Sequence, residues 1–379
     1  MDKKILNYTD FRHPYFKSAL AKVRGADNIL VWGDEDPDGI TATAIMVRCL
    51  RRIGKNVIYH IPSRKKEGIG LNRKKLKYFI DRREFDLLIT VDCGSVNAEE
   101  IQYLNECSKD VIITDHHIPY KGRYDSAEII NPHILNNESF THLAGAGVAL
   151  IFAVYLEKQI LQFRQYNDVL ADNEYYLVLA SIGTKCDRVT IKGLNQSIIK
   201  YIDMTYKYFP VLAAVGEDEI CGLVHQSKTE RNKNPLVEIF TGRYSQKRAE
   251  QTVRKLVSRK KRAERKMERL KKQAFDRADA SGSFIIYIDR TMDGGFAGLI
   301  ASALKDRYKK PCCVIAKRNS DLIGEARSDG EINWVDTLSG FSDYFQNWGG
   351  HKQAAGFTIK EERLDEFINS ITADIDNLQ

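Results

Sequence analysis

The stretch Asn28-Ile-Leu-Val-Trp32-Gly-Asp-Glu-Asp-Pro-Asp-Gly39 joins a short apolar run to an acidic turn that ends in glycine. A continuous apolar run of this length, closed by a turn, is typical of a strand that is buried on both faces of a parallel sheet. A helix is predicted to follow over residues 40–53. The stretch therefore predicts the strand, turn and helix with which an α/β sheet begins.

The same pattern repeats as far as residue 130, which predicts a doubly wound, parallel-sheet α/β domain. Helical periodicity beyond it, in 147–162 and 173–182, extends this first domain over residues 1–205. The further strands are predicted at 57–61, 87–91, 111–114 and 127–130, and the helices between them at 72–83 and 97–106.

The second half of the chain predicts a connecting segment, 206–280, and a smaller α/β domain, 281–379. Residues 245–280 contain no Gly or Pro and are rich in Lys, Arg, Glu and Ala, so one long basic helix is expected. That helix is either a solvated linker braced by Glu and Lys/Arg pairs or a contact for nucleic acid. In the last domain, strands are predicted at 283–289 and 311–316, and helices at 296–308 and 364–378.

Composition indicates a globular protein of the cytoplasm. The chain has 379 residues, 43% of them hydrophobic, with no apolar stretch long enough for a membrane span and no signal peptide at its start. Seven cysteines without a C-x-x-C pair indicate neither a disulfide framework nor a thiolate zinc site. A net charge of +7 is too mildly basic to establish a nucleic-acid partner by itself.

The acidic turn is the first motif that suggests chemistry. Four carboxylates within five residues repel one another, and a cation would relieve this crowding. Hard oxygen ligands at alternate positions suit Mg²⁺ or Mn²⁺. The alternative is an acidic surface turn. The four residues are Asp34, Glu35, Asp36 and Asp38.

Two further motifs follow predicted strands. Asp92, in Val-Asp-Cys-Gly-Ser, either faces a ligand at the end of its strand or caps the next helix. Asp115, His116 and His117 form the third motif, in which imidazole beside carboxylate favours Mn²⁺ over Mg²⁺. One histidine can bind metal while the other handles protons or phosphate oxygens, and Asp115 can orient a ligand. The alternative is a surface loop.

The three motifs together are more specific than each alone. Because the carboxyl ends of parallel strands meet at one edge of a sheet, these side chains are expected to converge. Asp187, in Gly183-Thr-Lys-Cys-Asp187 after a helix predicted to end at Ile182, could add another carboxylate. The sequence therefore predicts a two-metal phosphodiesterase site.

These motifs resemble those of the DHH phosphoesterase superfamily, in particular its RecJ-like single-strand exonucleases. The resemblance spans about residues 28–360 and includes His142-Leu-Ala-Gly-Ala-Gly-Val148 and Gly349-Gly-His-Lys-Gln-Ala-Ala-Gly356, the latter similar to the signature of the DHH-associated substrate domain. It implies metal ligands at Asp36, Asp38, Asp92, His116 and Asp187, with Asp92 bridging two Mn²⁺ ions. It implies supporting or catalytic roles for Asp34, Asp115 and His117.

The last domain offers candidate substrate contacts. Gly349 and Gly350 would let backbone N–H groups approach a phosphate, and His351 would donate a hydrogen bond or carry charge. The alternative is a glycine turn packed against the core. Arg327, followed by Ser328, resembles the family's substrate-binding arginine.

The resemblance implies a Mn²⁺-dependent hydrolase, with Mg²⁺ possible, that degrades single-stranded DNA or RNA from 5′ to 3′ and serves in DNA repair. Two alternatives stay open. One is an oligoribonuclease of the nanoRNase type or a small-phosphodiester hydrolase, since no OB-type module for holding single strands is evident after residue 360. The other is a partner protein of the replisome. Replication or repair proteins are expected partners, and a membrane is not.

Overall fold

The first half of the molecule is built on a parallel sheet of five strands in the order β2-β1-β3-β4-β5. Every pair of neighbouring strands in it is parallel. The doubly wound α/β fold predicted from the apolar runs is therefore confirmed. The strands are β1 (Asn28–Trp32), β2 (Asn56–His60), β3 (Leu87–Val91), β4 (Asp110–Thr114) and β5 (Glu128–Ile130).

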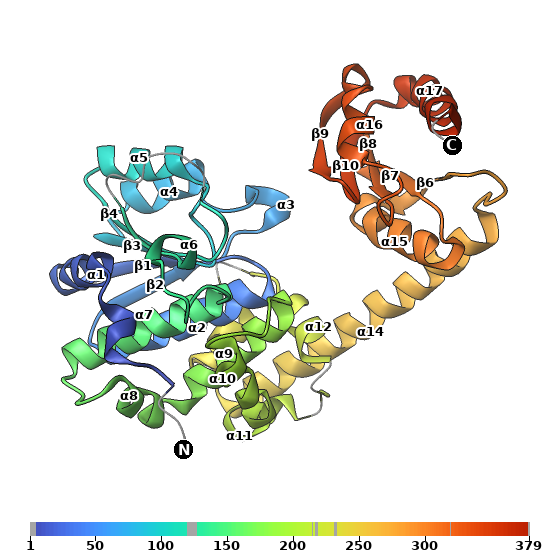
Figure 1. The fold of residues 1–379 in the computed structure, drawn as a ribbon. Helices are drawn as coiled ribbons and strands as arrows, with labels where there is room; N and C mark the ends of the chain where they lie inside the picture. Colours follow the sequence, from blue (N-terminus) through green and yellow to red (C-terminus); the bar gives the residue numbers. More distant parts are fainter. Residues whose placement is uncertain are drawn as a thin grey trace. The chain divides into compact units, whose positions relative to one another are not determined.

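The structure is a computed structural model that describes residues 5–119, 127–213, 215–216, 219–230, 233–318 and 320–377. It divides into two compact units, residues 1–260 and 261–379, and the division falls within a long helix. Each unit has its own sheet and its own core (Figure 1).

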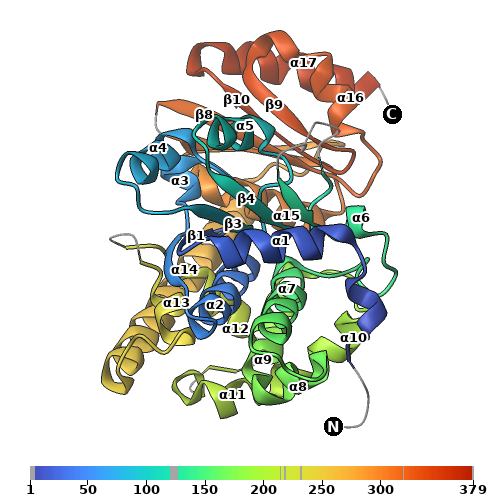
Figure 2. The same ribbon diagram turned by 90° about the vertical axis from the view of Figure 1, so that its left-hand side faces the viewer.

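Helices cover both faces of the first sheet (Figures 1 and 2). One face packs against α1 (Pro14–Gly25), α2 (Pro37–Arg52) and α7 (Gly145–Ile160), and the other against α4 (Arg73–Asp81) and α5 (Ala98–Glu106). Alternate residues of β1 serve the two cores, with Ile29 and Val31 in one and Leu30 and Trp32 in the other. The wholly apolar run in the sequence reflects this two-sided burial.

The first unit extends well beyond residue 205. Apolar residues of 206–260, among them Leu212, Phe240 and Leu256, belong to the same core as α2 and α7, so this segment packs with the first domain. The other helices of the unit are η1 (Tyr8–Phe11), α3 (Arg64–Glu67), α6 (Pro132–Leu135), α8 (Tyr166–Asp172), α9 (Glu174–Asp187), α10 (Asn195–Ile198), η2 (Ile199–Met204), α11 (Thr205–Tyr208), η3 (Pro210–Leu212), α12 (Ile220–His225) and α13 (Pro235–Phe240).

The long basic helix is α14 (Gln246–Arg277), close to the predicted bounds. Its first half buries Ala249, Val253 and Leu256 in the first unit, and its last turns bury Leu270 and Ala274 in the second. Among the described residues, every helix is too short or too polar to cross a lipid bilayer.

The second unit has a mixed sheet in the order β6-β7-β8-β10-β9. One face packs against α15 and the end of α14, and the other against α16 and α17. Three of the five strands, β8, β9 and β10, were not predicted. The elements are β6 (Ile285–Asp293), η5 (Gly294–Phe296), α15 (Ala297–Tyr308), β7 (Cys312–Arg318), β8 (Asp321–Arg327), α16 (Trp334–Ser339), η6 (Ser342–Tyr344), β9 (Phe345–His351), β10 (Ala354–Ile359), η7 (Glu361–Arg363) and α17 (Leu364–Asn377).

One disulfide joins Cys186 of α9 to Cys221 of α12. The expectation of no disulfide framework is wrong at this pair. The two residues are 35 positions apart, and only the packing of α12 beside the end of α9 brings them together. The other five cysteines are free.

Candidate metal centre

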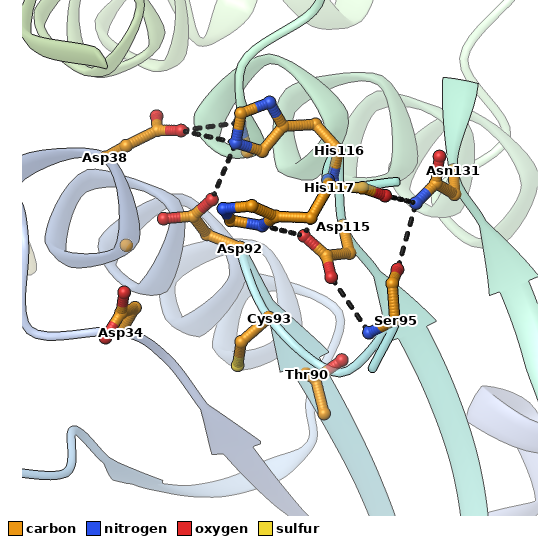
Figure 3. A network of polar contacts seen from close by, with 12 residues as sticks. Asp34, Asp38, Thr90, Asp92, Cys93, Ser95, Asp115, His116, His117 and Asn131 are labelled. Carbon is orange, nitrogen blue, oxygen red and sulfur yellow. Dashed lines mark hydrogen bonds and ion pairs between the residues drawn. The ribbon is translucent and has the colours of Figure 1, made fainter. Parts of the chain in front are cut away.

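The predicted site lies at the carboxyl edge of the first sheet, where β1 and β3 are neighbours (Figure 3). The chain leaves β1 for β2 on one side and later returns to β3 on the other, so strand order reverses here, as it does at the ligand sites of open α/β sheets. Residues 34–38 follow β1, Asp92 directly follows β3, and His116 follows β4. The three motifs meet as predicted.

The imidazole of His116 lies at the centre of a group of carboxylates. Its Nε2 atom is 3.3 Å from Asp92 Oδ1, 3.6 Å from Asp187 Oδ2 and 3.9 Å from Asp38 Oδ2. One atom from each of His116, Asp38 and Asp187 lies within 4.8 Å of the others, close enough to share one cation. Asp36 belongs to a second such group, with Asp34 and Asp92.

Asp92 is the least compensated charge of the site. Its side chain is 1% exposed, and neither carboxylate oxygen has a hydrogen-bond partner among the described residues. Burial, and then the nearby carboxylate of Asp38, raises the pKa of Asp92 well above its ordinary value. A buried anion without a partner is costly, and a bound cation would remove that cost.

Asp38 is held by the N-terminus of α7. Its two oxygens accept hydrogen bonds from the backbone N–H of Gly145 at 2.6 Å and of Ala146 at 2.9 Å, where the helix dipole favours an anion. Burial and the carboxylate of Asp187 nevertheless raise the pKa of Asp38 well above its usual range. The hydrogen bonds orient this carboxylate without neutralising it.

Two glycines make room for these carboxylates. A Cβ atom on Gly145 would lie 2.3 Å from Asp92 Oδ1, and one on Gly183 would lie 2.4 Å from Asp38 Oδ1. Both distances are far shorter than a van der Waals contact, so a side chain at either position would displace a carboxylate.

Asp187 is the last residue of α9. The prediction that this helix ends at Ile182 is wrong, because α9 continues through Gly183, which tolerates a helical backbone and lies against Asp38. Burial, and then the carboxylate of Asp36, raises the pKa of Asp187 to about 6. Asp36 itself caps α2 by accepting the N–H of Gly39 at 2.9 Å.

Asp115 and His117 form a pair beside the centre. Asp115 accepts a hydrogen bond from His117 Nδ1 at 2.8 Å and another from the N–H of Ser95 at 2.9 Å. Burial opposes the charge, but these bonds prevail and hold the pKa of Asp115 below its ordinary value, while Asp115 raises the pKa of His117 to about 9. Burial and the neighbouring His117 lower the pKa of His116 to about 4, so this imidazole is neutral at pH 7.

Two residues of the site, Arg64 and Asn131, were not predicted from the sequence. The Arg64 guanidinium bonds to Asp34 and lies 3.1 Å from Asp36 Oδ2. Asn131 donates to Ser95 Oγ and to the carbonyl oxygen of His117, both at 2.9 Å (Figure 3). Arg64 begins a basic run and Asn131 precedes a proline, and neither pattern is distinctive in sequence.

Most of the predicted substrate residues of the second unit lie on or beside one face of its sheet. Arg327 of β8 is opposite Ala354 of β10, which is opposite His351 of β9. Arg327 Nη1 forms an ion pair with Glu325 Oε2 at 3.0 Å. Ser328 is buried, and its hydroxyl donates to the carbonyl oxygen of Ile332 at 3.0 Å, so it supports the following loop.

The Gly349–Gly350 pair lies in a strand, β9, so the alternative is wrong in predicting a turn but correct in predicting that a glycine packs against Ala354 and Ala355. Gly350 has a φ of 153° and is opposite Ala355, where an added Cβ would lie 2.4 Å from Ala354 O. Close packing of β9 on β10 therefore accounts for this glycine. Gly349 has open space at its Cβ position.

Comparison with known proteins assigns both units to a family. Residues 28–182 match the DHH family, N-terminal domain, and residues 281–377 match the DHHA1 domain. The single-stranded-DNA-specific exonuclease RecJ of Bacillus subtilis is 28% identical over 98% of this chain, and that of Thermus thermophilus is 27% identical over 93%. The chain spans about half the length of these relatives, 49% and 52%.

Solved structures agree with this assignment. An exonuclease RecJ bound to manganese superposes with a TM-score of 0.81 at 25% identity, covering 98% of this chain and 95% of that one. The fold of Thermus thermophilus RecJ in complex with Mn²⁺ matches with a TM-score of 0.77 at 24% identity, over 99% of this chain and 56% of that one. The chain is a RecJ-like member of the DHH superfamily, with a DHH N-terminal domain followed by a DHHA1 domain.

Proposed function

We propose that this protein is a metal-dependent exonuclease that hydrolyses single-stranded DNA with two Mn²⁺ ions. The observation that carries the proposal is the buried carboxylate of Asp92, which accepts no hydrogen bond from the described residues and lies beside the neutral imidazole of His116. Without a bound ion, burying this carboxylate costs free energy, and a divalent cation would remove that cost. Single-stranded DNA is proposed as the substrate because the RecJ relatives of this chain are single-stranded-DNA-specific exonucleases.

The donor set fits such a cation. Carboxylate oxygens with one imidazole nitrogen suit Mn²⁺, and Asp92 would offer the ion two buried oxygens that accept no hydrogen bond from the described residues. When bound, a pair of divalent ions supplies a hydroxide nucleophile and stabilises the leaving oxygen of a phosphodiester. We assign the ligands to Asp36, Asp38, Asp92, His116 and Asp187.

The remaining residues of the centre position groups and hold protons. With a pKa of about 9, His117 is protonated at neutral pH and can donate to a phosphate or leaving-group oxygen. Asp115 fixes the orientation of that ring through Nδ1. Asp34 keeps the acidic turn in place through its bond to Arg64.

For the second unit we propose that Arg327 and His351, with the neighbouring glycines of β9, contact the nucleic-acid backbone, because Arg327 and His351 lie in one row of the sheet. A guanidinium matches the geometry of phosphate. Cleavage from 5′ to 3′ and a place in DNA repair are the finer expectations of the RecJ-like branch.

The test is hydrolysis of single-stranded DNA and RNA of several lengths, labelled at either end, with Mn²⁺, Mg²⁺ or EDTA. We expect mononucleotides released from the 5′ end of single-stranded DNA with Mn²⁺ and none with EDTA. Equal activity of Asp92→Asn and wild type would refute the metal site. Turnover of dinucleotides alone would instead favour an oligonucleotide phosphodiesterase.

A further inference from the structure

The helix α14 carries more positive charge than the whole protein. It holds fourteen Lys and Arg against four Asp and Glu, a net charge of +10, whereas the complete chain has +7. The rest of the chain is therefore net acidic. The basic character of this protein is concentrated in a single element.

The charge is also concentrated on one side of that helix. At 100° per residue, ten of the residues from 247 to 272 fall within an arc of about 120° and none of them is acidic, while the one acid that α14 places in this arc, Asp276, lies in its last turns. The two uncharged residues in this arc are Gln251 and Ser258. The eight cations, all exposed, are Lys247, Arg254, Lys255, Lys261, Arg262, Arg265, Arg269 and Lys272, and we call them the basic stripe.

The ion pairs of α14 lie mainly on its other sides. Within the described residues, the basic stripe contains one ion pair, a 3.9 Å contact from Arg254 to Glu250. Neighbouring like charges destabilise a helix, and a merely solvated helix would interleave acids with bases. The closer pairs that brace α14 use cations outside the stripe: Arg259 with Glu230, Lys260 with Glu219, and Lys271 with Glu268.

We propose that the basic stripe binds the phosphate backbone of single-stranded nucleic acid, independently of its sequence. This inference rests on the proposed function for its choice of a single strand. The part of the stripe in the second unit, from Lys261 to Lys272, runs for about 17 Å along the helix axis, enough for successive phosphates of one strand. It has no aromatic ring on which a base could stack, so it contacts the backbone only.

An anionic membrane is the less favoured partner. A helix that lies on a bilayer inserts an apolar face, but the apolar face of α14 is buried in protein, through Val253 and Leu256 in the first unit and Leu270 in the second. The stripe itself offers only charged and hydrogen-bonding groups.

The test is the salt dependence of binding to a fluorescein-labelled oligothymidylate, measured by fluorescence anisotropy in EDTA so that the strand is not hydrolysed. We plot the logarithm of the binding constant against the logarithm of the salt concentration. For a single strand, the magnitude of the slope is about 0.7 for each phosphate that the protein contacts. For the triple variant Arg262→Gln, Arg265→Gln, Arg269→Gln we expect the magnitude of the slope to fall by about 2. Glutamine keeps a high helix propensity, and circular dichroism checks the fold.

The matched control removes the same charge from three exposed lysines on separate helices, Lys17→Gln, Lys74→Gln, Lys200→Gln, and should leave the slope nearly unchanged. An unchanged slope in the stripe variant, or an equal loss in both variants, overturns the proposal. The proposal is also overturned if the stripe variant weakens binding to duplex DNA or to phosphatidylserine vesicles but not to the single strand. Because no hydrolysis is measured, a protein that binds but does not cleave would contradict the proposed function and not the stripe.

Discussion

His116 Nε2 lies 3.3 Å from Oδ1 of Asp92, a carboxylate that is buried and has no hydrogen-bond partner among the described residues. Burial keeps the histidine neutral at pH 7 by lowering its pKa, so it does not compensate the carboxylate. The pair is therefore arranged at a cost to the metal-free protein. That cost is the physical signature of a site built for a cation.

Asp92→Asn should stabilise the metal-free protein and abolish its response to metal. Removing a buried, uncompensated charge should raise the free energy of unfolding in EDTA by about 1–3 kcal/mol. Mn²⁺ at a hundred times its dissociation constant should stabilise the wild type by about 2.7 kcal/mol and the variant by nothing measurable. Thermal and denaturant unfolding with EDTA or Mn²⁺ measure both effects.

Asp276→Asn is the control for this change, since Asp276 is exposed on α14 and its loss should leave both quantities as in the wild type. If Asp92→Asn is destabilised in EDTA, or still gains stability from Mn²⁺, the carboxylate is structural and the metal assignment fails.

The pKa of Asp187 predicts a pH dependence. Its pKa is about 6 in the folded protein against an ordinary value of 3.8, so the folded state binds this proton more tightly. The stability that Asp187 contributes to the metal-free protein should therefore fall as pH rises from about 4 to about 6, and then level off. Subtracting the unfolding free energy of Asp187→Asn from that of the wild type, in EDTA at each pH, isolates this contribution.

Mn²⁺ should reverse the trend, because a metal competes with the proton and binds better as pH rises. If the difference in unfolding free energy between wild type and Asp187→Asn in EDTA does not change between about pH 4 and pH 6, Asp187 keeps an ordinary pKa.

Gly145→Ala should damage the metal centre through a single methyl group. The new Cβ would lie 2.3 Å from Asp92 Oδ1 and would force that carboxylate or α7 to move. We expect Mn²⁺ affinity, measured by calorimetry, to fall by about 10-fold or more. Gly25→Ala is the matched control, because its Cβ meets no atom within 4 Å and Mn²⁺ affinity should be unchanged. Equal affinity in both variants would mean that the site adapts freely.

Most of the site could be predicted from the sequence, because each of its motifs directly follows a recognisable apolar run. Apolar runs end at Trp32, Val91 and Thr114, and each run is followed at once by an acidic or histidine motif. Sheet geometry then requires these ends to meet, without any knowledge of side-chain contacts. The strand positions and the convergence therefore follow from periodicity alone.

The features that were not predicted depend on contacts between distant parts of the chain. Arg64 reaches the acidic turn from a short helix after β2, and nothing in its own neighbourhood marks it. The strands β8 to β10 lack continuous apolar runs, since one face of each is polar or glycine-rich, as at Glu325 and Gly349. The pairing of Cys186 with Cys221 likewise follows only from the packing of α9 and α12.

Cys221→Ser should destabilise the oxidised protein by removing this disulfide. Closing a loop of 35 residues restricts the unfolded chain, which corresponds to about 4 kcal/mol in the chain-entropy treatment. Because Cys186 immediately precedes Asp187 at the end of α9, we also expect weaker Mn²⁺ binding when the bridge is absent. Denaturant unfolding measures the first effect and calorimetry the second.

Cys107→Ser, at a free and half-buried cysteine, is the control for the disulfide and should change neither quantity. The wild type treated with a dithiol reductant should behave like Cys221→Ser, and Cys221→Ser itself should not respond to the reductant. If reduction lowers stability and leaves Mn²⁺ affinity intact, the bridge secures α12 without positioning Asp187. If it changes neither, the disulfide does not form in solution.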